Sequence, residues 1–531
     1  MSFIRSGGNG YHRPDSRRST GVARSIRPGS NRSADSVGAM STQRPTVQPA
    51  AAPPPEPSPA RGQDRAAQDA ARAVARPILT LFATCLALFL GQVDTTAINL
   101  ALPAMARDIS GGLASQQWVI DAYSVTFAAL LLTGGTLGDR FGRRRMFRIG
   151  IAVFVIGSIV CALASTFPVI ITGRVLQGVG SGTMLPQSLA ILATAFPERH
   201  DRNRAMAAWS VVAGLGLAAG PTIGGFVVQE INWNFIFWVN VPIGIASLLL
   251  AIRNVPESRN PNARRLDIPG QVFGAIALGL LTFVVVDGRN LGWLSPVVLT
   301  CVAVLVLCGV LFFVTERRHP SPLLPLNLMR RGQLPVATVV AMCMTFGMYG
   351  LFMLVSLAFQ QERGASALVA GVEMLPLPLV FMALSPLVGR LVTRYGPRLP
   401  MTAGMALMGL GMLIYALVGA DANIWLIEIA FVIVGIGLAL NTGPVVGVAV
   451  SAVSADRAGL ASGIANLARM FGSALGVAVQ GTVLAVVSVG ATHGPAFLSG
   501  VRDALLVGCA VELFGGLVAV LKVRNPKASA E

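Results

Sequence analysis

The chain has 531 residues, of which 53% are hydrophobic and only 12% are charged, and its mean hydropathy is +0.66. Soluble globular domains carry about 25% charged residues, so the composition excludes an ordinary soluble protein. The formal net charge of +17 does not indicate nucleic-acid binding, because no aromatic and basic recognition motif accompanies the arginines. All six cysteines fall in apolar stretches, so neither a disulfide framework nor a metal site is expected.

Residues 1–76 differ in composition from the rest of the chain. They are rich in Ser, Pro, Arg, Ala and Gln and show no apolar periodicity. Because such a segment buries too little apolar surface to fold, we expect a disordered tail. It carries twelve arginines and is expected to stay in the cytoplasm, near anionic lipid headgroups. It lacks the short apolar core of a cleavable signal peptide.

Fourteen apolar stretches follow, judged against the roughly 20 residues that a helix needs to cross a bilayer. They are 78–102, 116–137, 146–166, 168–194, 204–228, 234–252, 268–287, 295–315, 333–358, 367–390, 399–419, 424–450, 459–488 and 503–522. The expected fold is an all-α membrane protein with 14 transmembrane helices.

The distribution of basic residues predicts the orientation. An even number of spans puts both ends on one side, and the loops and ends of that side carry thirty-five Lys and Arg, against four on the other side. Cytoplasmic loops are the ones that retain Lys and Arg during insertion. We therefore expect a multi-pass protein of the cell (cytoplasmic) membrane with both termini in the cytoplasm.

A polar hinge separates the second and third spans. It contains Gly135, Asp139, Arg140, Gly142 and Arg143. Glycine permits a tight turn where helices approach closely, and Asp139 is able to pair with an arginine or to cap a helix N-terminus. The alternative is a basic loop that only sets the orientation.

Residues 389–398 form a second, similar hinge, in which Gly389, Arg394 and Gly396 match the first at one constant offset. The position of Asp139 is taken by Thr393. The pattern predicts two six-helix bundles in a pseudo-repeat, plus two inserted helices, with one pathway between the bundles. The expected domains are the tail 1–76, the first bundle 77–253, the insertion 254–331 with its flanking loops, the second bundle 332–522 and a short cytoplasmic tail 523–531.

The first hinge resembles the loop between helices two and three of the major facilitator superfamily of transporters. Three further stretches are similar to its fourteen-helix branch of drug:proton antiporters: 94–103 (DTTAINLALP), 174–180 (RVLQGVG) and 216–225 (GLAAGPTIGG). The third resembles an antiporter motif that separates exporters from uptake carriers, with the residues Gly216, Gly220, Pro221, Gly224 and Gly225. Span six also resembles the family, but has Asn234 where Arg is usual and Phe235 where Trp is usual.

Two charges inside the spans are the first candidates for proton coupling. An ionised carboxylate inside a span costs about 2.5 to 3.5 kcal/mol on insertion scales, so Asp94 must be protonated, paired or facing water. Thr95, Thr96 and Asn99 are expected to be its polar partners. Arg174 keeps its charge at cellular pH and offers a permanent partner for a carboxylate that switches. Purely structural roles are the alternatives for both Asp94 and Arg174.

Four other charges lie inside apolar stretches. Asp121 and Glu373 lie at matching depth near the outer ends of spans two and ten, where they are expected to bracket one outward-facing cavity. Alternatively, both extend to the outer surface. Arg469 belongs to a stretch that resembles the family's Asn-x2-Arg pair, and Glu512 lies in no motif that predicts a role.

These features predict a proton-coupled antiporter that exports amphipathic drugs or antibiotics by alternating access. A proton-coupled uptake symporter of a small metabolite is the alternative, because the sequence indicates the energy source better than the direction. An ATP-driven pump would need a P-loop lysine after a glycine, and neither Lys522 nor Lys527 has one. We expect that the protein is not an enzyme and that it uses no cofactor. The expected partners are an amphipathic small molecule, protons and membrane lipids, without nucleic acid.

Overall fold

The computed structural model describes residues 59–259, 266–319, 328–329, 332–419, 422–453 and 458–525. Within these ranges the regular structure is helical and contains no strand. Contacts divide the chain into residues 1–62 and 63–531, and all described residues except the first turn of α1 belong to the second unit. The expected tail 1–76 therefore lies mostly outside the described residues.

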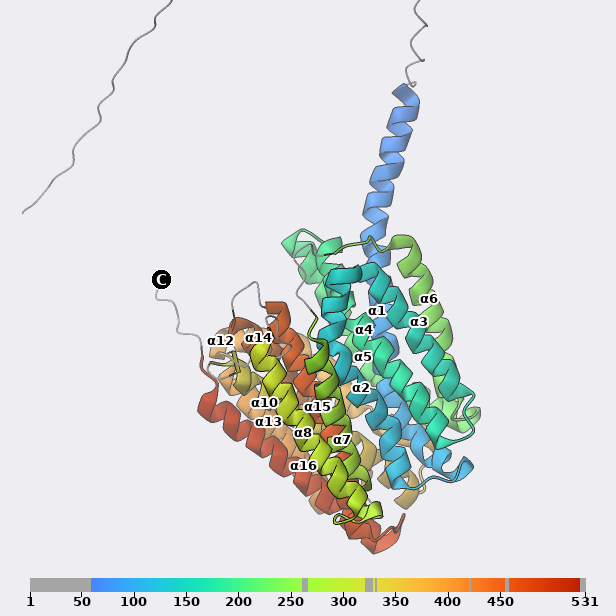
Figure 1. Ribbon diagram of the computed structural model, residues 1–531, viewed down its shortest axis with the longest axis vertical. Coiled ribbons are helices and arrows are strands. Elements are labelled where there is room, and N and C mark those ends of the chain that lie inside the picture. Colours follow the sequence, from blue (N-terminus) through green and yellow to red (C-terminus); the bar gives the residue numbers. More distant parts are fainter. Residues whose placement is uncertain are drawn as a thin grey trace, which may run out of the picture. The chain divides into compact units, whose positions relative to one another are not determined.

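The helices follow one another with short connections (Figure 1). In chain order they are α1 (Pro59–Asp108), α2 (Leu113–Phe141), α3 (Arg143–Ala162), α4 (Phe167–Ala195), α5 (Arg199–Glu230), α6 (Phe235–Asn254), α7 (Ile268–Leu291), α8 (Pro296–Arg318), α10 (Leu334–Leu357), the π-helix η1 (Ala358–Glu362), α11 (Ala367–Glu373), α12 (Pro376–Tyr395), α13 (Arg398–Val418), α14 (Ile424–Ser451), α15 (Ala458–Ser488) and α16 (Gly494–Lys522).

The start of α1 departs from the expectation for residues 1–76. The helix begins at Pro59, so residues 59–76 are helical rather than irregular. The reason is local composition: the stretch after Pro59 is dominated by Ala, Arg and Gln, which are strong helix formers. Proline at the first helical position also needs no backbone partner.

Twelve helices in the described part of the chain are long and apolar enough to cross a membrane, or thirteen if the bent α2 counts as one span. The bend of 51° falls between Leu131 and Thr133. The stretch expected at 168–194 forms the 29-residue α4, which is outside this set. Its arginine, glutamines and glycines lower its mean hydropathy. The structure thus supports twelve or thirteen membrane spans in the described residues, and the predicted count of fourteen is not confirmed.

Two groups of helices are connected by a few contacts. In the first group α4 packs on α2 and α3, and α3 packs on α6; in the second, α10 packs on α15, and α13 packs on α14 and α16. Helix α2 contacts α15, and α5 contacts α11 and α12. Helix α7 contacts α2 and α15, and α8 packs on α7 (Figure 1). Helix α8 exposes large apolar side chains such as Val306 and Phe313, as a lipid-facing helix does.

Helix α7 holds α2 and α15 together. The Trp118 Nε1 atom of α2 donates a hydrogen bond to Asp287 Oδ2 of α7 at 2.7 Å. On the other side, Thr482 of α15 donates to the Val285 carbonyl oxygen at 2.8 Å, and Arg289 donates to the carbonyl oxygen of Ala485. Helix α7 therefore joins one helix of each group.

We predict that Trp118→Phe lowers the free energy of unfolding by about 1.5 kcal/mol, because it removes a hydrogen bond to a charged acceptor. The new ring keeps its contact with Phe283, whose centroid lies 6.4 Å from that of Trp118. Thermal unfolding in detergent measures the change. Trp293→Phe is the matched control, since that indole is 47% exposed; equal shifts for both variants would contradict the prediction.

Candidate functional site

Asp94 and Arg174 form a buried ion pair between α1 and α4. The Arg174 Nη1 atom lies 2.6 Å from Asp94 Oδ2, and the exposed fractions of the two side chains are 1% for Arg174 and 0% for Asp94. A buried charge without a partner is strongly destabilising, whereas a paired and hydrogen-bonded one is tolerated. The structure thus brings together the two charges that the sequence singled out.

Amide side chains complete the coordination of the Asp94 carboxylate. Gln177 of α4 and Asn240 of α6 both donate to Asp94 Oδ1, at 2.9 Å and 2.8 Å. The same Gln177 amide donates to Ser158 Oγ of α3 at 2.8 Å. Groups from α4 and α6 therefore donate hydrogen bonds to both oxygens of Asp94. Helix α3 takes part indirectly, through the bond between Gln177 and Ser158.

Arg174 has partners besides the carboxylate. Its Nε donates to the Val119 carbonyl oxygen of α2 at 2.8 Å, and its Nη1 donates to Gln177 Oε1, also at 2.8 Å. The guanidinium also lies 4.5 Å from the centroid of the Tyr123 ring, a favourable cation–π position. We call Asp94, Arg174, Gln177, Asn240 and Ser158 the buried network.

The expected polar partners of Asp94 on its own helix do not serve that role. Thr95 donates to the Gly91 carbonyl oxygen at 2.7 Å, Thr96 donates to the Gln92 carbonyl oxygen at 2.9 Å, and Asn99 donates to carbonyl oxygens of α1. The expectation was wrong because short polar side chains in a helix bond most readily to the preceding turn. Neighbouring helices supply the partners instead.

Gln177, Asn240 and Ser158 were the residues of this network whose role sequence reasoning missed. All three are uncharged, and Gln177 and Asn240 lie in a stretch and a span that resemble the family. A polar amide inside an apolar span is itself the available signal, because buried polar groups need partners.

The glycines of the antiporter motif bring α5 close to α1. A Cβ atom at Gly216, Gly220 or Gly224 would meet Gln92, Thr96 or Ala97 of α1, respectively, at less than van der Waals distance. Gly225 instead faces Ala367 of α11, and the Pro221 carbonyl oxygen lies against Gly371 of α11. The motif therefore places α5 between Asp94's helix and the second group of helices.

The hinge between α2 and α3 is held by a carboxylate from another loop. Gly142 has φ +104°, and its backbone N–H donates to the Gly138 carbonyl oxygen at 3.0 Å. The Glu257 carboxylate, which follows α6, accepts from the N–H groups of Arg144 at 3.1 Å and Arg145 at 3.2 Å. It thereby caps the N-terminus of α3, a position that favours negative charge.

The charged hinge residues also interact within the hinge. Asp139 pairs with Arg143 at 2.8 Å, and the Arg140 guanidinium lies over the Phe141 ring. Gly135 lies against Pro186 of α4. The expected pairing of Asp139 with an arginine is therefore present, whereas the helix cap comes from Glu257.

The second hinge has the same arrangement. Gly396 has φ +77° and separates α12 from α13. The side chain of Asn525, which follows α16, accepts from the Arg398 N–H at 3.2 Å and donates to the Tyr395 carbonyl oxygen at 3.2 Å. Each hinge thus contacts a polar residue just beyond a later helix.

Asp121 and Glu373 are not brought into the buried network. Asp121 is fully buried on α2, and neither of its carboxylate oxygens has a hydrogen-bond partner among the described residues. One turn earlier, Gln117 donates to the carbonyl oxygens of Val477 and Ala478 of α15. Glu373 ends α11 and is partly buried.

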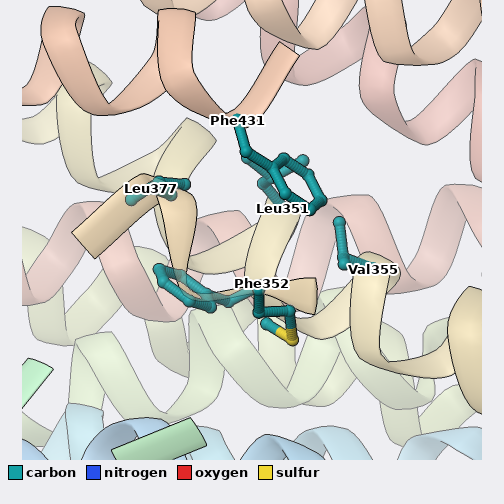
Figure 2. A pocket seen from close by; sticks show the side chains of 6 residues that line it. Leu351, Phe352, Val355, Leu377 and Phe431 are labelled. Carbon is teal, nitrogen blue, oxygen red and sulfur yellow. The ribbon is translucent and has the colours of Figure 1, made fainter. Parts of the chain in front are cut away.

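A small apolar cavity with a volume of about 10 Å³ lies in the second group of helices. Figure 2 shows its side chains converging from α10, α12, α14 and the end of α11. The lining residues are Leu351, Phe352, Val355, Met374, Leu377 and Phe431. Neither Asp121 nor Glu373 lines it, so it is not the shared cavity that was expected between them.

Comparison with known proteins assigns the family. Residues 84–477 match the Major Facilitator Superfamily. The chain belongs to this superfamily. Among its relatives, "Multidrug resistance protein Stp" of Mycobacterium tuberculosis is 38% identical over 410 residues, covering 77% of this chain and 76% of the relative. "Methylenomycin A resistance protein" of Bacillus subtilis is 33% identical over 409 residues, covering 77% and 87%.

Solved structures of the superfamily share the fold. A crystal structure of an auto-inhibited POT family peptide transporter matches with a TM-score of 0.63 and 15% identity, covering 86% of this chain and 98% of that one. At this identity the likeness concerns the fold alone. The family assignment and the apolar helices indicate a multi-pass membrane transporter.

We predict that Gly142→Ala destabilises the protein by about 1 to 3 kcal/mol, because the backbone at positive φ strains a side chain and the new methyl group would collide with Glu257. Gly389→Ala, which meets nothing within 4 Å, is the control. Thermal unfolding of both variants is the measurement. A Gly142→Ala protein as stable as the control would contradict the assigned strain.

Proposed function

We propose that the protein exports amphipathic drugs or antibiotics across the cytoplasmic membrane in exchange for protons. The buried network is the observation that carries the proposal, because Asp94 offers a carboxylate whose protonation has defined partners in either state. The names of the relatives support export: besides the two above, "Drug efflux pump JefA" of Mycobacterium tuberculosis is 35% identical over 419 residues.

The network tolerates a proton on Asp94. Protonation removes the charge from Oδ2 and weakens its charge-assisted bond to Arg174. Arg174 still retains the Val119 carbonyl oxygen, Gln177 Oε1 and the face of the Tyr123 ring. The guanidinium is therefore never left without partners, which is the condition for a buried charge to take part in a cycle.

Asn240 supplies the acceptor that a protonated Asp94 needs. In the ionised arrangement its Nδ2 donates to Asp94 Oδ1, and its own Oδ1 has no partner among the described residues. If the Asn240 amide group rotates by 180°, its Oδ1 atom faces Asp94 and accepts a hydrogen bond from the protonated carboxyl group. Asn240 is thus a positioning residue that serves both protonation states of the carboxyl group.

The architecture that we propose has fourteen membrane-spanning helices in a pseudo-repeat. Helix α4 is the additional span, since it packs on α2 and α3 and contributes Arg174. The bundles are 77–253 and 332–522, with 254–331 inserted and 523–531 as a cytoplasmic tail. The matching hinges with their Glu257 and Asn525 contacts support the repeat. The arginine-rich hinges place both termini in the cytoplasm.

The proposed substrate route runs between the two bundles, where α2 meets α15 and α5 meets α11. The apolar cavity in the second group of helices, with a volume of about 10 Å³, is far smaller than the roughly 300 to 1,000 Å³ of ligand pockets, so it does not hold a drug-sized molecule in this conformation. Glu373, which is partly buried, is the carboxylate that favours substrates with a positive charge, and Asp121, next to α15, is a polar group beside this route. Membrane lipids surround the spans.

We predict that Asp94→Asn removes the resistance that the protein gives to a cell lacking its own pumps, because an amide carries no exchangeable proton. Asp94→Glu should retain part of it. Resistance to a broad drug panel and dissipation of a pH gradient by drug in everted vesicles are the measurements, with the exposed Asp503→Asn as control. Arg174 loses its counter-charge in Asp94→Asn, so expression is checked by size exclusion.

Three results would contradict this assignment. Gradient-driven export by a normally expressed Asp94→Asn protein would move the coupling role to Asp121 or Glu373. A pH change of opposite sign in everted vesicles would indicate an uptake symporter. No change of resistance across the panel would count against drug export altogether.

A further inference from the structure

Glu512 is a buried carboxyl group that the proposed cycle has not used. It lies on α16 with an exposed fraction of 0%, and neither carboxylate oxygen has a hydrogen-bond partner in the part of the chain that the structure describes. Across from it, Gly347 of α10 lacks a Cβ atom that would overlap the Glu512 carboxyl group. The space for this side chain is therefore provided by a glycine of the neighbouring helix.

A second acceptor without a partner lies beside the same turn of α10. Gln480 of α15 donates through Nε2 to the Phe346 carbonyl oxygen at 2.9 Å, but its Oε1 has no partner within the described ranges. Gly350 faces the Gln480 amide, and a methyl group at Gly508, one turn before Glu512, would stand 3.2 Å from Gln480 Oε1. Glu512 and Gln480 thus lie against glycines one turn apart on α10, and three of their oxygens, which can only accept, have no donor among the described residues.

A proton on Glu512 supplies the missing donor. The titratable groups that face Glu512 are the thiols of Cys343 on α10 and Cys509 on α16, and α13 contributes the methionines Met405 and Met412 near this face of α16. Neither a thiol nor a thioether compensates the charge of an ionised carboxylate. Burial without a charged partner or hydrogen bond therefore holds Glu512 neutral in this conformation.

We infer that Glu512 is a second proton-binding site, in the second group of helices, which loads and releases a proton during the transport cycle. It lies ten residues before the end of α16, or about 15 Å from the arginine-rich side at 1.5 Å per residue. An opening toward that side hydrates the group and lets its proton leave. The inference rests on the proposed antiport and implies that each cycle carries more protons than Asp94 alone provides.

The first test is spectroscopic and does not need transport. Infrared difference spectra of the purified protein, recorded across a pH titration, report protonated carboxyl groups. Glu512→Gln is expected to lose one band that Asp94→Asn retains. Glu512→Met, with an apolar side chain of similar length, should lose the same band and fold at least as stably. Unchanged spectra in both Glu512 variants would overturn the inference.

The second test measures the number of protons per drug. The experiment uses proteoliposomes without a membrane potential and a pH difference of about one unit. The drug gradient that Glu512→Gln sustains is expected to be about tenfold smaller than that of the wild type. Drug binding should keep its Kd. Equal gradients would overturn the inference. If the wild type itself shows no exchange of drug for protons, the proposed function fails, and the infrared band alone decides whether Glu512 binds a proton.

Discussion

The ion pair between Asp94 and Arg174 is the constraint on which the first group of helices depends. Each of the two charges loses several kcal/mol of hydration free energy when it is buried, and only close pairing together with hydrogen bonds offsets this loss. Asp94, Arg174, Gln177, Asn240 and Ser158 come from α1, α3, α4 and α6. These four helices therefore cannot separate without leaving a buried charge exposed to lipid or without its counter-charge.

Movement is then left to the contacts between the groups. They join α2 with α15 and α5 with α11 and α12, and α7 bridges α2 and α15. The glycines of α5 keep that helix against α1 on one side and against α11 on the other. Gly142 and Gly396 fix the hinges with help from Glu257 and Asn525.

Much of this could be predicted from the sequence, and the remainder has a physical reason. Apolar length predicted most of the spans, and the charges Asp94 and Arg174 were identified because an ion inside an apolar span is costly. The orientation, for which the arginine asymmetry is the argument, stays a prediction. The partners of Asp94 were not predicted correctly, since hydrogen bonds between helices depend on rotation and depth. Helix α4 is less apolar than the other spans because it carries several polar residues. The same polar residues make it part of the buried network.

Contacts between residues far apart in the chain could not be predicted from the sequence either. Glu257 caps α3 across 113 residues of chain, and no local pattern indicates that contact. Glu512 was noticed as a charge but had no motif, and only the structure shows Gly347 making room for it. Residues 59–76 had been expected in a disordered tail, although their alanines favour helix.

The most direct test of the account is proton release on drug binding, followed with a pH indicator in weakly buffered detergent solution. The account predicts that drug displaces the proton of Asp94, so Asp94→Asn should bind drug and release about one proton fewer per bound molecule than the wild type. Proton release equal to that of the wild type, at equal drug occupancy, would show that Asp94 does not carry the exchanged proton.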